Sequence, residues 1–154
     1  INTIVQSISK TIKKFSFPFS INSNQPIAIS SVDLEKVTNV INDSESETGL
    51  IINIGFMGTV NKLEIRNIET GENFIIDYEF MKNDKLIINC NRGKKSVILT
   101  REAVEYNLIP QVRSESTFFQ LGIGDNRFSF LADDGEKDML VDISFKYYRV
   151  YLGV

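Results

Sequence analysis

Residues 73–80 read NFIIDYEF, and the alternation within this stretch decides the fold class. Its apolar side chains recur at every second position, as Phe74, Ile76, Tyr78 and Phe80. Alternation with period two is the mark of a β-strand with one buried and one solvated face. The stretch therefore predicts a strand with these four side chains toward the core and Ile75, Asp77 and Glu79 on the opposite face.

The same period recurs along most of the chain. Further strands are predicted around 14–21, 50–56, 63–66, 86–90, 97–99, 128–130 and 139–151, with less regular strands at 27–32 and 36–42. Turn sequences rich in Gly, Asn and Asp separate these runs. Strands this short and regularly spaced predict an all-β antiparallel sandwich or barrel.

Three segments carry more specific expectations. The four strands between residues 60 and 100 are joined by short turns, which predicts an antiparallel meander. Pro18 cannot donate to a strand ladder, so the strand at 14–21 is expected to lie at a sheet edge or to end early. Residues 101–108 read REAVEYNL and predict a short helix or a loop that ends before Pro110.

Length and composition limit the class of protein. The 154 residues fit one domain, and the 42% hydrophobic and 24% charged residues are typical of a globular protein. A formal net charge of −3 argues against nucleic acid or an anionic membrane as partner. No apolar run approaches the roughly 18 residues that cross a bilayer. The chain begins with Ile and shows no signal-peptide pattern, so we expect a fragment or a processed product.

The residue types that carry most catalysis and metal binding are missing. The sequence has no His, no Trp and a single cysteine, Cys90. It therefore lacks the Ser-His-Asp and Cys-His arrangements, an imidazole or Cys-rich zinc site, and any intrachain disulfide. Cys90 shares an alternation face with Leu86 and Ile88, which favours a buried and inert thiol. No enzyme activity and no cofactor are predicted.

Two groups of carboxylates are weak candidates for a site. The first is an acidic cluster made of Asp133, Asp134, Gly135, Glu136 and Asp138. Oxygen-rich loops hold calcium, but this spacing does not match the ligand positions of an EF-hand, and a solvated hairpin loop is the favoured interpretation. The second is Glu45 with Glu47, which offers an acid/base pair for glycoside hydrolysis without any sign of burial.

Three other features are weaker still. Residues 122–124 (GIG) begin like a dinucleotide fingerprint but lack its third Gly and a following helix. A basic turn is expected to be a charged hairpin tip and consists of Arg92, Lys94 and Lys95. The last predicted strand places Tyr147 and Tyr151 on the core face and Tyr148 on the other, where an exposed Tyr can anchor an interface.

The order of several segments resembles a known family. The segments are 14–19 (KFSFPF), 47–54 (ETGLIINI), 67–72 (NIETGE), 84–89 (DKLIIN), 121–130 (LGIGDNRFSF) and 148–154 (YRVYLGV). This succession resembles the C-terminal domain of distal tail proteins of long-tailed phages and of related prophage tail proteins. The resemblance covers residues 14–154, so we expect a single β-sandwich domain there and a linker or leading segment at residues 1–13.

The resemblance implies a jelly-roll or galectin-like β-sandwich in the hub that joins the tail tube to the baseplate or tip. Family members normally form a ring, usually hexameric, through an N-terminal belt domain. We do not expect that domain within these 154 residues, so the isolated fragment is expected to be a monomer. The implied partners are other tail and baseplate proteins. The implied location is the virion tail, assembled in the host cytoplasm. Galectins bind sugar through His, Asn, Arg and Trp, and a sequence without His or Trp departs from that pattern.

The first hypothesis is therefore a structural domain of a phage or prophage tail hub that acts through protein–protein contacts. The alternative is a carbohydrate-binding sandwich module with Tyr or Phe as its stacking surface, and a sandwich-fold glycosidase ranks behind both. A flat protein-facing patch, a groove with an exposed aromatic, or a pair of buried acids would distinguish the three. No residue is assigned a catalytic, cofactor-binding or metal-binding role.

Overall fold

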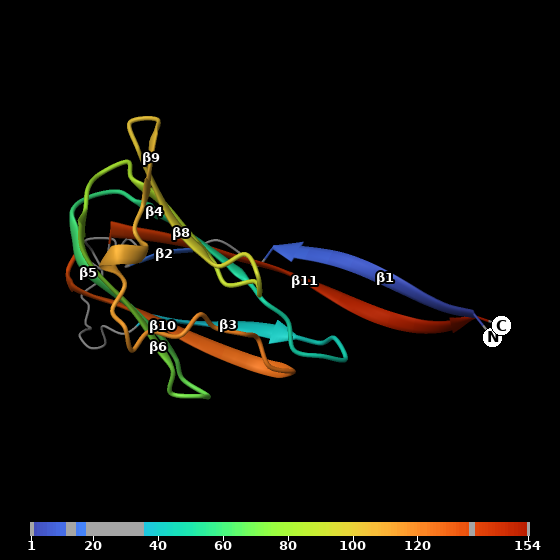
Figure 1. The fold of residues 1–154 in the computed structure, drawn as a ribbon. Coiled ribbons are helices and arrows are strands. Elements are labelled where there is room, and N and C mark those ends of the chain that lie inside the picture. The colour runs from blue at the N-terminus through green and yellow to red at the C-terminus, as the bar shows by residue number, and fades with distance from the viewer. Residues whose placement is uncertain (1, 12–14, 18–35, 136–137, 154) are drawn as a thin grey trace, which may run out of the picture.

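The computed structural model describes residues 2–11, 15–17, 36–135 and 138–153, and two antiparallel sheets face each other in it (Figure 1). The large sheet has seven strands: in order β1 (Asn2–Thr11), β11 (Met139–Gly153), β4 (Ile51–Phe56), β7 (Lys85–Asn89), β8 (Ser96–Arg101) and β9 (Val104–Asn107), with β2 (Phe15–Phe17) also pairing with β11. The small sheet has the order β3 (Lys36–Asn42), β10 (Gly124–Asp134), β5 (Val60–Asn67) and β6 (Asn73–Phe80). The all-β antiparallel sandwich is confirmed, while the finer jelly-roll or galectin-like assignment stays a prediction.

The hydrophobic core fills the space between the sheets, and most of its side chains are those that the alternation selects. On β6, Phe74, Ile76 and Phe80 are fully buried, and Tyr78 packs against the core at its margin. On the other strands, the predicted core residues whose side chains the structure describes are also buried, namely Leu50, Ile52, Ile54, Phe56, Leu63, Ile65, Leu86, Ile88, Cys90, Val97, Leu99, Phe128, Phe130, Met139, Val141, Ile143 and Phe145. The core-face predictions for Tyr147 and Tyr151, and the opposite one for Tyr148, concern side chains outside those that the structure describes.

One residue predicted to face away from the core is buried as well. Ile75 is only 7% exposed because the segment 112–117 lies along the free edge of β6. The Arg113 backbone N–H donates to the Ile75 carbonyl oxygen at 2.9 Å, and the Ile75 N–H donates to Ser116 Oγ at 2.9 Å. The period of a strand does not report what covers its outer face, so this burial is a tertiary effect.

The meander predicted for residues 60–100 is wrong. The β5–β6 pair belongs to the small sheet and the β7–β8 pair to the large one, so the chain changes sheets between β6 and β7. The connection is held by Asn83 N–H donating to the Phe56 carbonyl at 2.8 Å and by Phe56 N–H donating to the Asp84 carbonyl at 3.0 Å. These bonds align β7 with β4 instead of β6. Alternation defines which face of a strand is buried but not which strand lies beside it.

The prediction of a helix or loop at residues 101–108 is also wrong. The segment closes a hairpin between β8 and β9, followed by a 3₁₀ turn at Ile109–Gln111 that contains Pro110. The two turn residues, Glu102 and Ala103, have φ of 50° and 65°. Positive φ at both positions is the signature of a type I′ hairpin turn, which normally carries Asn-Gly or Asp-Gly. The left-handed conformation costs a non-glycine residue about 1–2 kcal/mol. Because Glu and Ala are not typical of this turn, the sequence does not indicate it.

The N-terminal part of the chain is described in pieces. β2 pairs with β11 alone among the described strands, which agrees with the expected edge position, whereas Pro18 and the point at which the strand ends lie outside the described residues. The strand expected at 36–42 is confirmed, whereas Phe19, Ile21 and the segment 27–32 lie outside the described residues.

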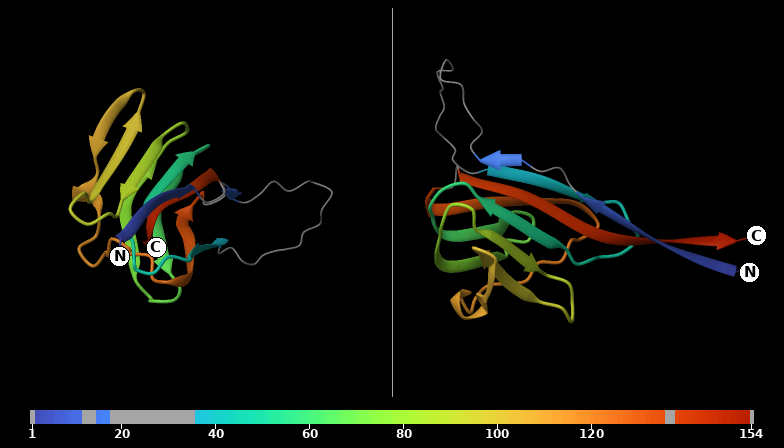
Figure 2. Two further views of the ribbon diagram at one scale, coloured as in Figure 1. Left: turned by 90° about the vertical axis from the view of Figure 1, so that its right-hand side faces the viewer. Right: turned by 90° about the horizontal axis from the view of Figure 1, so that it is seen from above.

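A long two-stranded ribbon projects from the sandwich. β1 pairs with β11 from Asn2 opposite Gly153 to Thr11 opposite Ser144. The ribbon brings the two ends of the chain side by side, away from the core (Figures 1 and 2). The domain boundary expected between residues 13 and 14 stays a prediction. In the described part of the chain, no helix is long and apolar enough to cross a membrane.

Truncation of a central core side chain provides a test of the face assignment. Ile76 is fully buried on β6, and Ile76→Ala is expected to lower the free energy of unfolding by about 2–5 kcal/mol because it leaves a cavity between the sheets. Urea denaturation of the two proteins measures the difference. A loss below about 0.5 kcal/mol, the range of ordinary surface substitutions, would show that Ile76 does not face the core.

Candidate interaction groove

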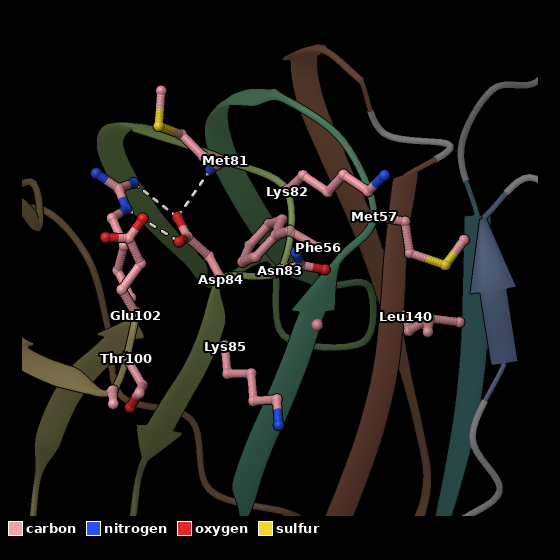
Figure 3. Close-up of a pocket in the computed structure, with 13 residues that line it drawn as sticks. Phe56, Met57, Met81, Lys82, Asn83, Asp84, Lys85, Thr100, Glu102 and Leu140 are labelled. Carbon is pink, nitrogen blue, oxygen red and sulfur yellow. Dashed lines mark hydrogen bonds and ion pairs between the residues drawn. The ribbon is translucent and has the colours of Figure 1, made fainter.

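A groove of about 820 Å³ lies at one end of the large sheet, on the face turned away from the small sheet. Strands β4, β7 and β11 form its floor, and the loops 81–84 and 102–103 form its rim (Figure 3). A smaller hollow of about 300 Å³ adjoins it and shares Gly55, Lys85 and Leu140 with it. The two hollows together are called the outer groove below.

A missing side chain creates the floor of the outer groove. Gly55 of β4 lies opposite Leu140 of β11 on one side and opposite Lys85 of β7 on the other. A Cβ placed on Gly55 would have Leu140 Cβ at 4.0 Å as its nearest neighbour, so the space above the glycine is open. Glycine within a strand weakens the strand and often marks a close approach by a ligand or another backbone. At position 55 it leaves a recess between Leu140 and Lys85.

A buried ion pair fixes the rim of the outer groove. Asp84 is 1% exposed and accepts two hydrogen bonds from Arg101, from Nε to Oδ1 at 2.9 Å and from Nη2 to Oδ2 at 2.7 Å. The Met81 backbone N–H donates to the same carboxylate at 2.8 Å, and the guanidinium lies 5.6 Å from the centre of the Tyr78 ring. This bidentate contact holds the β6–β7 loop against the β8–β9 hairpin.

The electrostatics of this pair favour its charged form. Burial raises the pKa of Asp84, but the hydrogen bonds from Arg101 and from the Met81 N–H, with the guanidinium charge, outweigh burial and hold the pKa below its usual range. The pKa of Arg101 is raised, mainly by its hydrogen bonds to Asp84. Both groups are therefore fully charged at neutral pH and satisfied by each other, which is the arrangement of a structural clamp.

The walls of the outer groove are apolar with a few charged groups. Met57 and Met81 are each about half exposed, and methionine adapts its shape to irregular partners. Lys82 and Lys85 add exposed ammonium groups, and Glu102 adds a carboxylate at the rim. The outer groove thus suits the binding of a protein surface with apolar side chains.

The acidic candidates from the sequence lie elsewhere. Asp133 is exposed and 3.8 Å from Lys62 Nζ, Asp134 pairs with Asn61 in the β10–β5 ladder, and the Asp138 N–H donates to the Gly135 carbonyl. Glu136 lies outside the described residues. Among the described residues, no three His, Cys, Asp or Glu side chains gather where they could hold a metal ion.

The remaining candidates divide between the surface and the core. Glu47 and Arg92, which belong to two separate sequence candidates, form an exposed ion pair of 2.9 Å between two loops. Cys90 is fully buried, and burial raises the pKa of its thiol to about 12, so the thiolate is not available at neutral pH. Residues 122–124 lead into β10, where Gly122 N–H donates to Asn126 Oδ1 at 3.0 Å.

Sequence inspection did not find the outer groove. Its floor glycine interrupts the apolar run 50–56, and its buried acid lies between a turn and the strand that follows. Either position could have indicated a site, because a Gly inside a strand and an Asp next to buried apolar residues are both unusual. The residues that line the outer groove come from four separate parts of the chain, and only the fold brings them together.

Comparison with known proteins agrees with this architecture. Residues 43–148 match the family described as siphovirus-type tail component, C-terminal domain. No curated protein sequence matches the chain. The crystal structure of SPP1 Dit (gp 19.1), described as a paradigm of the hub adsorption apparatus in phages that infect Gram-positive bacteria, has the same fold with a TM-score of 0.55 at 14% identity.

The extent of these matches defines what they establish. The alignment with SPP1 Dit covers 77% of this chain and 47% of that protein, so the chain spans about half of its length. At 14% identity the likeness concerns the fold alone. The family match, in contrast, covers more than half of this chain and includes every strand from β4 to β10. The chain therefore belongs to the siphovirus-type tail component family, of which it carries the C-terminal domain.

Proposed function

We propose that this chain is a structural domain of a phage tail hub and that it works through contacts with other tail proteins, one of them made by the outer groove. The observation that carries the proposal is the family match over residues 43–148. All residues that line the outer groove, from Asn53 to Asp142, fall within that range. The hub description of SPP1 Dit supports the same position for this chain.

The proposed function implies a location and partners for this chain. A siphovirus-type tail component is part of the virion tail, and we propose that it is built into the tail in the host cytoplasm. Its proposed partners are neighbouring tail and baseplate proteins. Ring formation by the whole protein, with many copies of a weak contact, would raise the effective concentration of each surface. The family is one of structural tail components, which supports a role without catalysis.

The carbohydrate-binding alternative finds no support in the outer groove. A sugar needs an exposed aromatic face for stacking, and Phe56 is the aromatic residue among those that line the groove. Phe56 is 2% exposed, and its ring stacks on Phe80 with centroids 4.4 Å apart. The faces of the Phe56 ring are therefore buried in the core and cannot stack on a sugar. The exposed side chains that line the groove include methionine and lysine instead.

Localisation within the virion tests the proposed function. The phage gene would be tagged in its genome, and gold-labelled antibody against the tag would be located on purified virions by electron microscopy. We expect one cluster of label at the end of the tail that is distal to the capsid. Label spread along the tube, or virions that lack the protein, would overturn the hub assignment.

A substitution at the groove floor tests the contact surface. Gly55→Arg is expected to fold, because a side chain at this position enters open space, but to fill the recess with a charged group. Buried interface centres typically lose about tenfold or more in binding when disrupted, so complementation of a gene-deleted phage should fall by at least about tenfold. The readouts are infectious titre and the amount of the protein in purified virions.

A matched control separates the groove from general surface effects. Val37→Arg adds the same group at an exposed position of β3, on the other sheet. This variant should complement nearly as well as the unchanged protein. Thermal melting of both purified variants checks that each is folded. Normal titre and incorporation of folded Gly55→Arg would show that the outer groove makes no necessary contact.

A further inference from the structure

The β8–β9 hairpin forms one edge of the large sheet. Among the described strands β9 pairs with β8 alone, and all four of its residues are exposed. The hairpin projects away from the rest of the sandwich (Figure 1). The left view of Figure 2 shows it at the outer end of the sheet. Strands with a free edge offer a ladder of backbone groups to another chain.

The register shows which backbone groups of β9 are free. Arg101 lies opposite Val104 across a two-residue turn, and the Leu108 N–H donates to the Val97 carbonyl at 2.9 Å. In an antiparallel pair the hydrogen-bonded positions alternate, so Val104, Tyr106 and Leu108 direct their backbone groups toward β8. The N–H and C=O of Glu105 and Asn107 therefore point outward, and no described residue pairs with these four groups.

The side chains of β9 present a different chemistry on each face. Val104 and Tyr106 lie opposite Arg101 and Leu99, on the face that turns toward the core, but they extend beyond the small sheet and are 50% and 45% exposed. Glu105 lies on the other face. Neither Glu105 nor the neighbouring turn residue Glu102 has an ion-pair partner within the described part of the chain.

The turn that presents β9 is strained. Glu102 and Ala103 occupy the left-handed region that glycine and asparagine adopt more readily. Residues held in such conformations cluster at functional positions, where the surrounding structure maintains them. Arg101, next to this turn, is anchored by Asp84, so the hairpin projects from a fixed base. Strain, projection and a free edge thus coincide in one hairpin.

We propose that β9 binds an extended segment of another protein as an additional strand of the large sheet. The segment carries apolar side chains on the Val104 and Tyr106 face and basic side chains on the Glu105 face. The free N–H and C=O groups of Glu105 and Asn107 form the new ladder, which is recognition by strand addition. That the segment belongs to a tail protein rests on the proposed function.

A second copy of this chain fits the edge less well. Pairing two β9 strands would bring four carboxylates, Glu102 and Glu105 from each copy, into one short seam without any basic residue of β9 to offset them. Like charges opposite each other destabilise a strand pair. A basic segment from a different protein instead neutralises this edge.

Hydrogen exchange tests the proposal on the protein in purified tails and on the whole isolated protein. In the isolated protein, the amides of Glu105 and Asn107 should exchange much faster than those of Val104 and Tyr106. In purified tails, the Glu105 and Asn107 amides should slow by at least about tenfold, as ladder amides do. If the protein is present in tails but these amides exchange as in isolation, strand addition is wrong and the tail function stands. If tails lack the protein, both proposals fall.

Two variants of Glu105 separate the backbone from the side chain. Glu105→Pro removes the outward N–H without removing a hydrogen bond to β8, and proline is tolerated on edge strands at such positions. Its incorporation into tails should fall by at least about tenfold, whereas Glu105→Gln, which keeps the N–H, should lose only a few-fold. Thermal melting of the isolated variants checks their folding. Equal incorporation of folded Glu105→Pro, or sedimentation of the isolated protein as a dimer with slowed Glu105 exchange, would overturn the proposal.

Discussion

Replacing Asp84 by alanine is expected to lower the free energy of unfolding by about 3 kcal/mol, the low end for breaking a buried ion pair. The low end applies because the Arg101 side chain is 26% exposed and regains some hydration. The variant leaves the guanidinium without its carboxylate and the Met81 N–H without its acceptor. Chemical denaturation at neutral pH measures the loss.

The pH dependence gives a second signature of the same pair. The pKa of Asp84 is lower in the folded protein than in the unfolded chain, where it is about 3.9. Its contribution is therefore fully present above that value and is lost as the pH falls through the folded-state pKa. The stability difference between the two proteins should accordingly be constant near neutral pH and shrink below about pH 4.

An exposed pair of similar geometry provides the control. Arg113 and Asp77 are joined by two hydrogen bonds of 2.6 and 3.1 Å, but both side chains are more than a third exposed. Asp77→Ala should therefore cost no more than about 1 kcal/mol. Equal losses for Asp77→Ala and Asp84→Ala would show that burial of the Asp84 clamp adds nothing to stability.

Replacing Phe80 by alanine in the otherwise unchanged protein is expected to lower the free energy of unfolding by about 3–5 kcal/mol. The Phe80 ring is fully buried, stacks on Phe56 with an interplanar angle of 2°, and meets the Tyr78 ring edge-on at 5.4 Å. Alanine leaves a cavity between the two sheets at the end where the chain changes sheets. Urea denaturation measures the loss, and Met81→Ala, at the adjacent exposed position, should stay within about 0.5 kcal/mol. A Phe80→Ala loss no larger than that of Met81→Ala would show that the Phe80 ring adds nothing to the core.

The sequence by itself determined most of the side chains that form the core. Alternation along 73–80, 50–56 and 139–145 selected residues that are buried in the sandwich. The alternation is informative because successive residues of a strand point to opposite faces. The hydrophobic effect buries the apolar face, whichever strand lies alongside. The order of the segments also indicated the family that residues 43–148 match.

Only the tertiary structure decided how the strands are arranged and where a partner can bind. The crossing between β6 and β7 depends on backbone bonds from Phe56, which is distant in the sequence, and the burial of Ile75 depends on the segment 112–117. The outer groove requires Gly55, Asp84 and Arg101 to meet at one end of the large sheet. The free edge of β9 exists because this strand is last in its sheet. Such features arise from pairing between distant segments, and a local period carries no information about the identity of the neighbour.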